Sequence, residues 1–176
     1  MKPGASAQRA APGMSEVRMR PGKGASHAMP STHLSLHYHV VFSTKARRAL
    51  IRESWRERLH AYLGGTVREL GGVARAVGGT HDHVHVLADL RAQHSLAAVM
   101  RELKHSSSRW VHETLRISGF AWQTGYGAVT VSPSGIEPVL RYMAKQMEHH
   151  REKTFQEEYL DLLQQSGVRF DERYLW

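Results

Sequence analysis

The chain of 176 residues contains no cysteine. Disulfide bonds and thiolate zinc sites are therefore excluded, and the composition is compatible with a reducing compartment. The sequence also lacks any apolar run near the ~18 residues that a membrane span requires. Residues 1–32 contain no aromatic residue and no apolar segment of the kind found in secretory signals. Together with a length typical of one domain, these absences predict a single hydrophobic core without covalent staples.

Acidic residues are fewer than basic ones: the chain has 16 Asp and Glu and 24 Lys and Arg, which gives a formal net charge of +8. Such a balance favours a polyanionic partner, either nucleic acid or an anionic membrane surface, although it also serves solubility alone. Half of the excess lies in residues 1–32, a stretch rich in Gly, Ala, Pro and Ser with no hydrophobic period. We predict a disordered basic tail there, with Met14 and Met29 as alternative start positions.

Residues 33–176 show alternating strand and helix patterns and are predicted to form one domain. Strands are expected over residues 33–45, 73–79, 83–90 and 126–132. Helices are expected over residues 52–72, 95–117, 134–153 and 155–167, with Ser95 as an N-cap. This order predicts an α+β fold, in which an antiparallel sheet carries helices on one face in a ferredoxin-like or RRM-like arrangement.

The segment GGTHDHVHVLADL (78–90) places His81, His83 and His85 at every second position of an expected strand. Residues i and i+2 of a strand share a face, so the three imidazoles are expected to point one way and Val84 and Val86 into a core. Two imidazoles at this spacing can bind one divalent metal ion. The alternative is a row of exposed or hydrogen-bonded histidines on an edge strand.

A second histidine pair, His37 and His39 in LHYHV, repeats this spacing on the first strand, where the sequence identifies no polar partner for it. A third ligand is instead offered by LRYMAKQMEHH, in which Tyr142 and Gln146 at i, i+4 lie on one helical face about 6 Å apart. The Gln carbonyl suits a hard cation, and the Tyr could attack a metal-bound phosphate. Tyr142 at helical spacing with Val139, Met143 and Met147 is also typical of a core position.

Basic and hydroxyl side chains that suit phosphate oxygens gather in two places. The segment STKARR contributes Lys45, Arg47 and Arg48, and RELKHSSSRW contributes Arg101, Lys104 and Ser108 at i, i+3 and i+7. An ordinary solvated surface is the alternative for each.

Two aromatic residues add to these candidates. Trp122 and Tyr126 could stack on unpaired bases, or they could belong to the core or a dimer interface. The acidic segment FQEEYLDLL is expected to pack on the domain or a partner subunit rather than face DNA.

Four segments taken together resemble a known family. In order and spacing, DHVHVL, LKHSSSRW, FAWQTGYGAVTVS and YMAKQ are similar to the single-tyrosine HUH transposases of the insertion-sequence 200/605 type. The opening LHYHVVFSTKARR and the ending RYLW fit as well, so the resemblance spans residues 31–176. A single His-hydrophobic-His motif is loose, whereas the ordered set is specific.

The resemblance implies an enzyme that cuts and rejoins single-stranded DNA at insertion-sequence ends. It implies Tyr142 as the nucleophile that forms a 5′-phosphotyrosine link, with His83, His85 and Gln146 as ligands of Mg²⁺ or Mn²⁺. It also implies DNA hairpins as partners and a homodimer in which the tyrosine helix can serve the other subunit. A bacterial cytoplasmic protein acting at the nucleoid, with no membrane partner, is expected. The family often carries an acidic or polar residue where His81 stands, so His81 stays outside the expected ligand set.

Two other functions stay open on the sequence alone. One is a non-catalytic, domesticated binder of single-stranded or hairpin DNA, with the histidines as relics. The other is a metal-dependent hydrolase that uses bound water and a general-base carboxylate. Asp82 and Asp89 are the only acids near the histidine pair in sequence, and both are expected on the opposite face of the strand. This argument ranks the hydrolase last.

Overall fold

A computed structural model describes residues 33–150 and 153–175. The basic tail predicted for residues 1–32 lies outside the described residues. The described part of the chain belongs to one compact unit. None of its helices is long and apolar enough to span a membrane.

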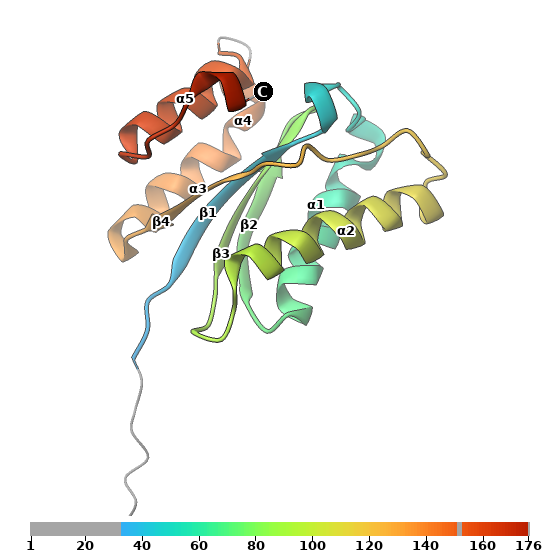
Figure 1. Cartoon of the computed structure of the whole chain (residues 1–176). Coiled ribbons are helices and arrows are strands. Elements are labelled where there is room, and N and C mark those ends of the chain that lie inside the picture. The colour runs from blue at the N-terminus through green and yellow to red at the C-terminus, as the bar shows by residue number, and fades with distance from the viewer. Residues whose placement is uncertain (1–32, 151–152, 176) are drawn as a thin grey trace, which may run out of the picture. The chain divides into compact units, whose positions relative to one another are not determined.

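An antiparallel sheet forms the centre of the described unit (Figure 1). Its strands are β1 (His37–Ser43), β2 (Val73–Gly79), β3 (His83–Asp89) and β4 (Gly127–Val131), in the order β2-β3-β1-β4. In the central pair, Val41 lies opposite His85 and Ser43 lies opposite His83. Two crossover helices separate the strands in the ferredoxin-like order, so the predicted α+β fold is confirmed.

The main hydrophobic core lies between one face of the sheet and two helices, α1 (Glu53–Glu69) and α2 (Leu96–Thr114). Strand alternation explains which residues enter it, because Val40, Phe42, Val84 and Val86 all share this face. The burial of Val84 and Val86 was expected from the same alternation. Ser95 stands at the N-cap position of α2, although its side chain makes no capping hydrogen bond.

The other face of the sheet is covered by α3 (Ile136–Ala144), α4 (Gln146–His149) and α5 (Phe155–Gln165) (Figure 1). A small core of Leu87, Ile136 and Met143 joins α3 to this face. Gly78 permits the close approach, since a Cβ atom there would lie 3.3 Å from the carbonyl oxygen of Met143. Helices therefore lie on both faces, and the odd-numbered side chains of β1 and β3 are buried or half-buried instead of facing solvent.

The helix predicted over residues 134–153 is broken in the structure. A 3₁₀ turn (Pro133–Gly135) precedes α3, and α3 is separated from α4 by Lys145, whose φ of −100° and ψ of 11° are not helical. The amide of Lys145 bonds to the carbonyl oxygen of Tyr142, three residues back, which tightens the last turn. A new helix then starts at Thr154, where Thr154 and Glu157 form a capping box that satisfies amides at the start of α5.

Two contacts dock α5 on the sheet. Gly127 in β4 leaves room for the ring of Tyr159, since a Cβ atom at Gly127 would come within 2.6 Å of that ring. Phe155, in the first turn of α5, stacks on the ring of His83 with 4.4 Å between centroids. The face of α5 that contains Glu158 is thereby turned toward the histidines of β3.

Candidate active site

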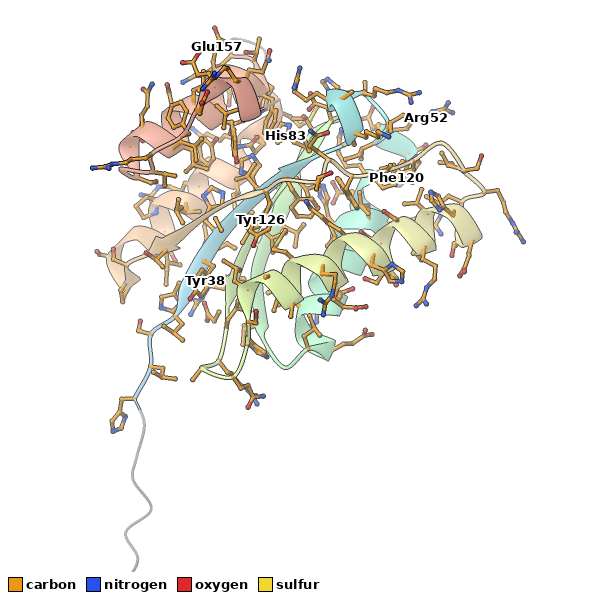
Figure 2. All side chains as sticks on the ribbon, in the orientation of Figure 1. Tyr38, Arg52, His83, Phe120, Tyr126 and Glu157 are labelled. Atoms are coloured by element: carbon orange, nitrogen blue, oxygen red, sulfur yellow. The ribbon has the colours of Figure 1, made fainter. Side chains whose placement is uncertain are left out.

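His83 lies on the face of the sheet that α4 and α5 cover (Figure 2). His85, two residues along β3, shares this face, and the exposed fractions of the two side chains are only 0% and 1%. They share a face as expected, and they are not a solvent-facing row. His81 is exposed and precedes β3, which begins at His83. The expectation that it shares the face of the pair was wrong, because strand alternation does not extend into the turn.

The ring of His83 is oriented by the turn before it. Its Nδ1 lies 2.7 Å from Oδ1 of Asp82 and 3.1 Å from Oγ1 of Thr80. A carboxylate can only accept, so Nδ1 donates this hydrogen bond, and Nε2 is the nitrogen that faces Gln146 and Glu158. Burial acts to raise the pKa of Asp82, but the hydrogen bonds from His83 and Thr80 outweigh it and the pKa is lowered. Asp82 was expected on the opposite face, which was wrong because it belongs to the turn.

His39 orients the second ring of the pair. Nε2 of His39 lies 2.9 Å from Nδ1 of His85, and the two rings are stacked. Burial lowers the pKa of His39 to about 4, so its ring is neutral at pH 7. Nε2 of His39 can then accept a hydrogen bond from Nδ1 of His85. His37 also has a partner, Oδ1 of Asp89 at 2.6 Å. The sequence predicted no partner for either histidine, because the partners come from the pairing of β1 with β3.

Gln146 and Glu158 complete the surroundings of the pair. Gln146, the expected third ligand, is 2% exposed, and its Oε1 lies 3.4 Å from Nε2 of His83. Its Nε2 donates to Oε1 of Glu158 at 2.8 Å. Glu158 is 4% exposed, with Oε1 3.4 Å from Nε2 of His85 and Oε2 3.6 Å from Nε2 of His83.

Sequence reasoning missed Glu158. It expected α5 to pack on the domain, which it does, but this packing brings a carboxylate to the histidines. The argument that only Asp82 and Asp89 lie near the pair was therefore wrong. The available signal was the position of Glu158 between Phe155 and Leu162 at helical spacing, a charged residue on the apolar face of α5. Burial, and then the charge of Asp82, raise the pKa of Glu158 to about 8.

These side chains fit a divalent cation. One ligand atom each from His83, His85 and Glu158 lies within 4.8 Å of the others. The separations of 3.4 and 3.6 Å are longer than a good hydrogen bond of ~2.7–3.2 Å. Neighbouring ligands held ~2.1 Å from one ion lie about 3.0–3.4 Å apart in octahedral or tetrahedral geometry, so the 3.4 Å separation fits a shared ion and the 3.6 Å separation would have to close by ~0.2 Å. Such an ion requires nitrogen and oxygen donors that face one point. It also requires imidazoles held in a fixed orientation, and both rings are oriented here through Nδ1.

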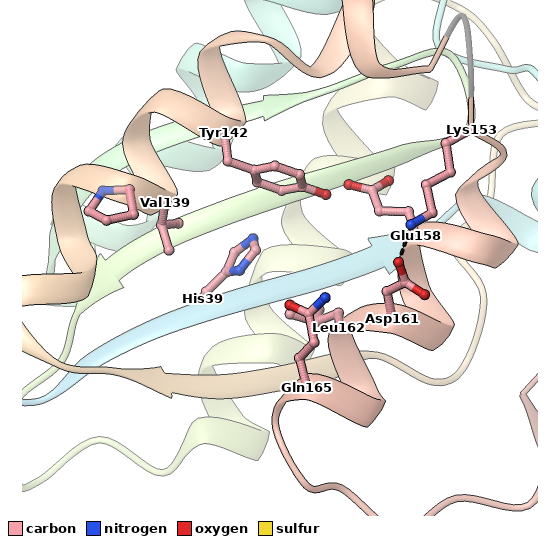
Figure 3. Close-up of a pocket in the computed structure, with 9 residues that line it drawn as sticks. His39, Val139, Tyr142, Lys153, Glu158, Asp161, Leu162 and Gln165 are labelled. Atoms are coloured by element: carbon pink, nitrogen blue, oxygen red, sulfur yellow. Dashed lines mark hydrogen bonds and ion pairs between the residues drawn. The ribbon is translucent and has the colours of Figure 1, made fainter.

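Tyr142 reaches the same site from α3 despite the break in the helix. Its half-buried ring lies edge-on to His85, with 5.8 Å between ring centroids. Figure 3 shows its hydroxyl directed toward the carboxylate of Glu158. Both residues line a pocket of about 400 Å³ between α3 and α5, together with His39, Lys153 and Asp161. A phenol, a metal-competent group and a cavity are thus adjacent within one chain.

The basic segment after β1 lies at the end of the sheet where β3 begins. Lys45 and Arg48 are exposed and Arg47 is half-buried. Oγ1 of Thr44 donates to the carbonyl oxygens of Arg48 at 2.6 Å and of Asp82 at 3.2 Å. The loop is therefore tied to the turn that orients His83.

Arg101, Lys104 and Ser108 line a groove of about 590 Å³ on the α2 side of the sheet. The ammonium of Lys104 donates to the carbonyl oxygens of residues 123–125, at 2.9, 3.0 and 2.6 Å. Burial lowers the pKa of Lys104 to about 8. Lys104 thus holds the segment that forms the other wall of the groove, whereas Arg101 is exposed.

The two aromatic candidates differ in their surroundings. Trp122 is buried, its Nε1 donates to Oγ of Ser107 at 2.9 Å, and its ring packs edge-on against Phe42 and Phe120, so it is a core residue. Tyr126 is 37% exposed and lines the groove.

Comparison with solved structures supports the fold. A candidate transposase from Deinococcus radiodurans R1 is 22% identical with a TM-score of 0.52, over 73% of this chain and 98% of that one. A REP-associated tyrosine transposase bound to a REP hairpin is 12% identical with a TM-score of 0.52, over 69% of this chain and 74% of that one. None of the curated proteins compared with the chain matches it.

The family model described as "Transposase IS200 like" matches residues 32–146. This segment is more than half of the chain and contains His83, His85, Tyr142 and Gln146. The chain therefore belongs to the IS200-like transposase family of DNA-cleaving enzymes.

Proposed function

We propose that this transposase cuts and rejoins single-stranded DNA through a covalent link to Tyr142. The observation that carries the proposal is the position of Tyr142, beside His85 of the same chain and in a pocket shared with Glu158. Residues from β3, α3 and α4 converge there, although 57 to 63 positions separate Tyr142 and Gln146 from His83 and His85 in the chain. A pure binding protein has no need of this convergence.

His83, His85 and Gln146 would hold Mg²⁺ or Mn²⁺. An ion bound there would neutralise charge on the non-bridging oxygens of the scissile phosphate. Asp82 and His39 keep the two imidazoles oriented, so the nitrogens need not reorganise during the reaction. Oxygen donors beside the imidazoles favour a hard cation over a soft one.

Tyr142 would attack the phosphorus in line with the departing 3′-oxygen. A free phenol has a pKa near ~10, so its proton must be removed within the site. The bond between the phenolic oxygen and phosphorus forms as the bond from phosphorus to the 3′-oxygen breaks. The 3′-oxygen leaves as a hydroxyl, and the 5′-phosphate stays on Tyr142. Because the phosphotyrosine retains the phosphodiester energy, a 3′-hydroxyl can reverse the reaction and rejoin strands without ATP.

The DNA would contact Lys45, Arg47 and Arg48 at the site end of the sheet, and Arg101, Lys104 and Ser108 along the α2 groove. The two regions adjoin, since the amide of Lys45 bonds to the carbonyl oxygen of Ala121 and Ala121 lines the groove. The similar REP-associated transposase is described as bound to a REP hairpin. We extend this to hairpins near element ends as the substrate here, bound by a homodimer.

A covalent-adduct assay tests the proposal. Labelled single-stranded DNA from both flanks of the gene is incubated with the protein and Mn²⁺ or Mg²⁺, then run on a denaturing gel. Wild type should give a band that survives denaturation and disappears with EDTA. Tyr142→Phe should abolish this band, because it removes the nucleophile and retains the ring. Tyr126→Phe is the matched control and should retain it.

The carboxylate of Glu158 near the histidines favours a second candidate, hydrolysis by bound water with a general base. A hydrolase would cleave the DNA without an adduct and would remain active as Tyr142→Phe. A hairpin-specific shift on a native gel, with neither cleavage nor adduct, would instead favour the non-catalytic binder. Either result contradicts the tyrosine mechanism.

A further inference from the structure

We propose that Glu158 is a fourth protein ligand of the metal ion and that Gln146 and His150 position its carboxylate. The inference rests on the proposed function, in which His83, His85 and Gln146 bind the ion. It concerns a residue of α5 outside the segment that matches the family, because that segment ends at residue 146. The ligand set would then combine the family segment with a helix that follows it.

The first argument is the burial of the Glu158 carboxyl group. Glu158 is 4% exposed, and buried carboxylates are normally paired or bound to metal. Among the described residues, its ion-pair partners His83, His85 and His150 are all histidines, and a histidine carries no permanent charge. The carboxylate faces the nitrogens of His83 and His85 at separations too long for good hydrogen bonds. A cation between these atoms would satisfy them together.

The second argument is the way Gln146 is oriented. Its Nε2 donates to Oε1 of Glu158 at 2.8 Å, which turns its own Oε1 toward Nε2 of His83. The two donor oxygens, one from an amide and one from a carboxylate, are thereby held on the same side as the imidazoles. A single side chain can then bind the ion and position its neighbour.

His150 holds the other carboxylate oxygen. Its Nδ1 lies 2.9 Å from the carbonyl oxygen of Lys153, which can only accept, so this nitrogen donates. Its Nε2 lies 2.6 Å from Oε2 of Glu158, within ion-pair distance. Oε2 is thus engaged by His150, and Oε1 is the oxygen that lies closest to His85.

Four protein donors would leave two positions of a six-coordinate ion for phosphate oxygens. The carboxylate would also lower the net charge of the bound site from +2 to +1. Both features suit an ion that must hold a phosphodiester and later release it.

The proposal is tested by titrating the metal-free full chain with Mn²⁺. Binding is measured from the electron paramagnetic resonance signal of the unbound Mn²⁺. Glu158→Gln keeps the size and the acceptor for Gln146 but removes the charge, and we expect Mn²⁺ affinity to fall by at least ~10-fold, as for groups that support metal sites. Glu157→Gln is the matched control, since Glu157 is exposed in the same helix and its capping box accepts Gln. Its affinity should stay within about twofold of wild type.

His85→Ala separates this proposal from the proposed function. If His85→Ala abolishes Mn²⁺ binding and Glu158→Gln binds like wild type, the fourth ligand is overturned and the three-ligand site stands. If wild type binds no Mn²⁺, or if His85→Ala binds as tightly as wild type, both proposals are overturned.

Unfolding of the variants is followed by circular dichroism without metal. Should Glu158→Gln fail to fold, Glu158→Asp takes its place, because it keeps the charge and withdraws the oxygen by one methylene. The Asp variant should bind Mn²⁺ more weakly than wild type and give a changed signal for the bound ion. Binding equal to wild type would overturn the proposal.

Discussion

At the scale of single residues, the site depends on which nitrogen of each histidine faces inward. Asp82 engages Nδ1 of His83, and His39 engages Nδ1 of His85. Both Nε2 atoms therefore face Glu158. Histidine thus occurs in two settings here: His83 and His85 turn Nε2 toward Glu158, whereas His39 contacts Nδ1 of His85.

His39 gives the protein an acid sensitivity whose sign is fixed. Its pKa is about 4 in the folded protein against an ordinary value of 6.5, because burial disfavours the charged ring. Between these values the unfolded chain binds more protons, so folding stability is lost as pH falls from 6.5 toward 4. At ~1.4 kcal/mol per pH unit, this one residue lowers the free energy of unfolding by about 3 kcal/mol at pH 4 relative to neutral pH.

We expect His39→Gln to lose less stability than wild type over that pH window, measured by urea unfolding at several pH values. The Gln carbonyl can still accept from His85, and it does not titrate in this range. His105→Gln, on the exposed surface of α2, is the control and should follow wild type. Parallel curves for wild type and His39→Gln would contradict the assignment of a buried neutral ring.

Sequence reasoning proposed site residues that lie in local motifs, and it missed residues that reach the site through tertiary contacts. His83, His85, Tyr142 and Gln146 belong to short motifs whose spacing is visible along the chain. His39 reaches His85 through the pairing of β1 with β3, and Glu158 arrives with the docking of α5. Local spacing does not identify the partner of either residue: it marks Glu158 as a charged residue on the apolar face of α5, but it does not show that this face meets the histidines.

At the scale of elements, strands were predicted closely where glycine marks their ends. Residues 73–79 were expected as a strand and form β2, which Gly72 precedes and Gly79 closes with a φ of +141°. The helix over 134–153 was predicted as one piece because its apolar period continues past Lys145. The break there and the capping box at Thr154 are local backbone events, and only the capping box has a sequence signature.

Gly127 tests whether the docking of α5 sets the geometry of the site. In Gly127→Ala, the new Cβ atom would lie 2.6 Å from the ring of Tyr159, so α5 must shift. We expect a loss of about 1–3 kcal/mol in folding stability, as for overpacked sites. Mn²⁺ affinity should also fall by several-fold if Glu158 is a ligand, because Glu158 moves with α5.

Gly125→Ala is the matched control two residues away, since a Cβ atom there meets no atom within 4 Å. Thermal unfolding and Mn²⁺ titration of both variants provide the comparison. Unchanged affinity in a destabilised Gly127→Ala would show that the position of α5 does not control metal binding.

At the scale of the whole described unit, the candidate site and the α2 groove lie on opposite faces of one sheet. The loop over residues 45–48 lies at the end of the sheet where both can be reached, tied to Asp82 on one side and to Ala121 on the other. In the proposed DNA path, a single strand leaving a hairpin in the groove passes this end to reach Tyr142. The excess of basic residues attracts DNA to any part of the surface. A specific path past residues 45–48 therefore has to depend on where the charges lie and not on their number.

Removing Lys45 and Arg48 together tests this path, because both are exposed at the site end of the sheet. In the double Ala variant, the slope of log affinity against log salt for a hairpin with a single-stranded flank should become shallower by about 1–2, at ~0.7–0.9 per phosphate contact. Arg68→Ala with Arg91→Ala removes the same charge near the opposite ends of β2 and β3, where both arginines are exposed. Filter binding across salt concentrations should leave the slope of this control unchanged. Equal losses in the two double variants would mean that DNA responds to net charge alone, and the path past residues 45–48 would be wrong.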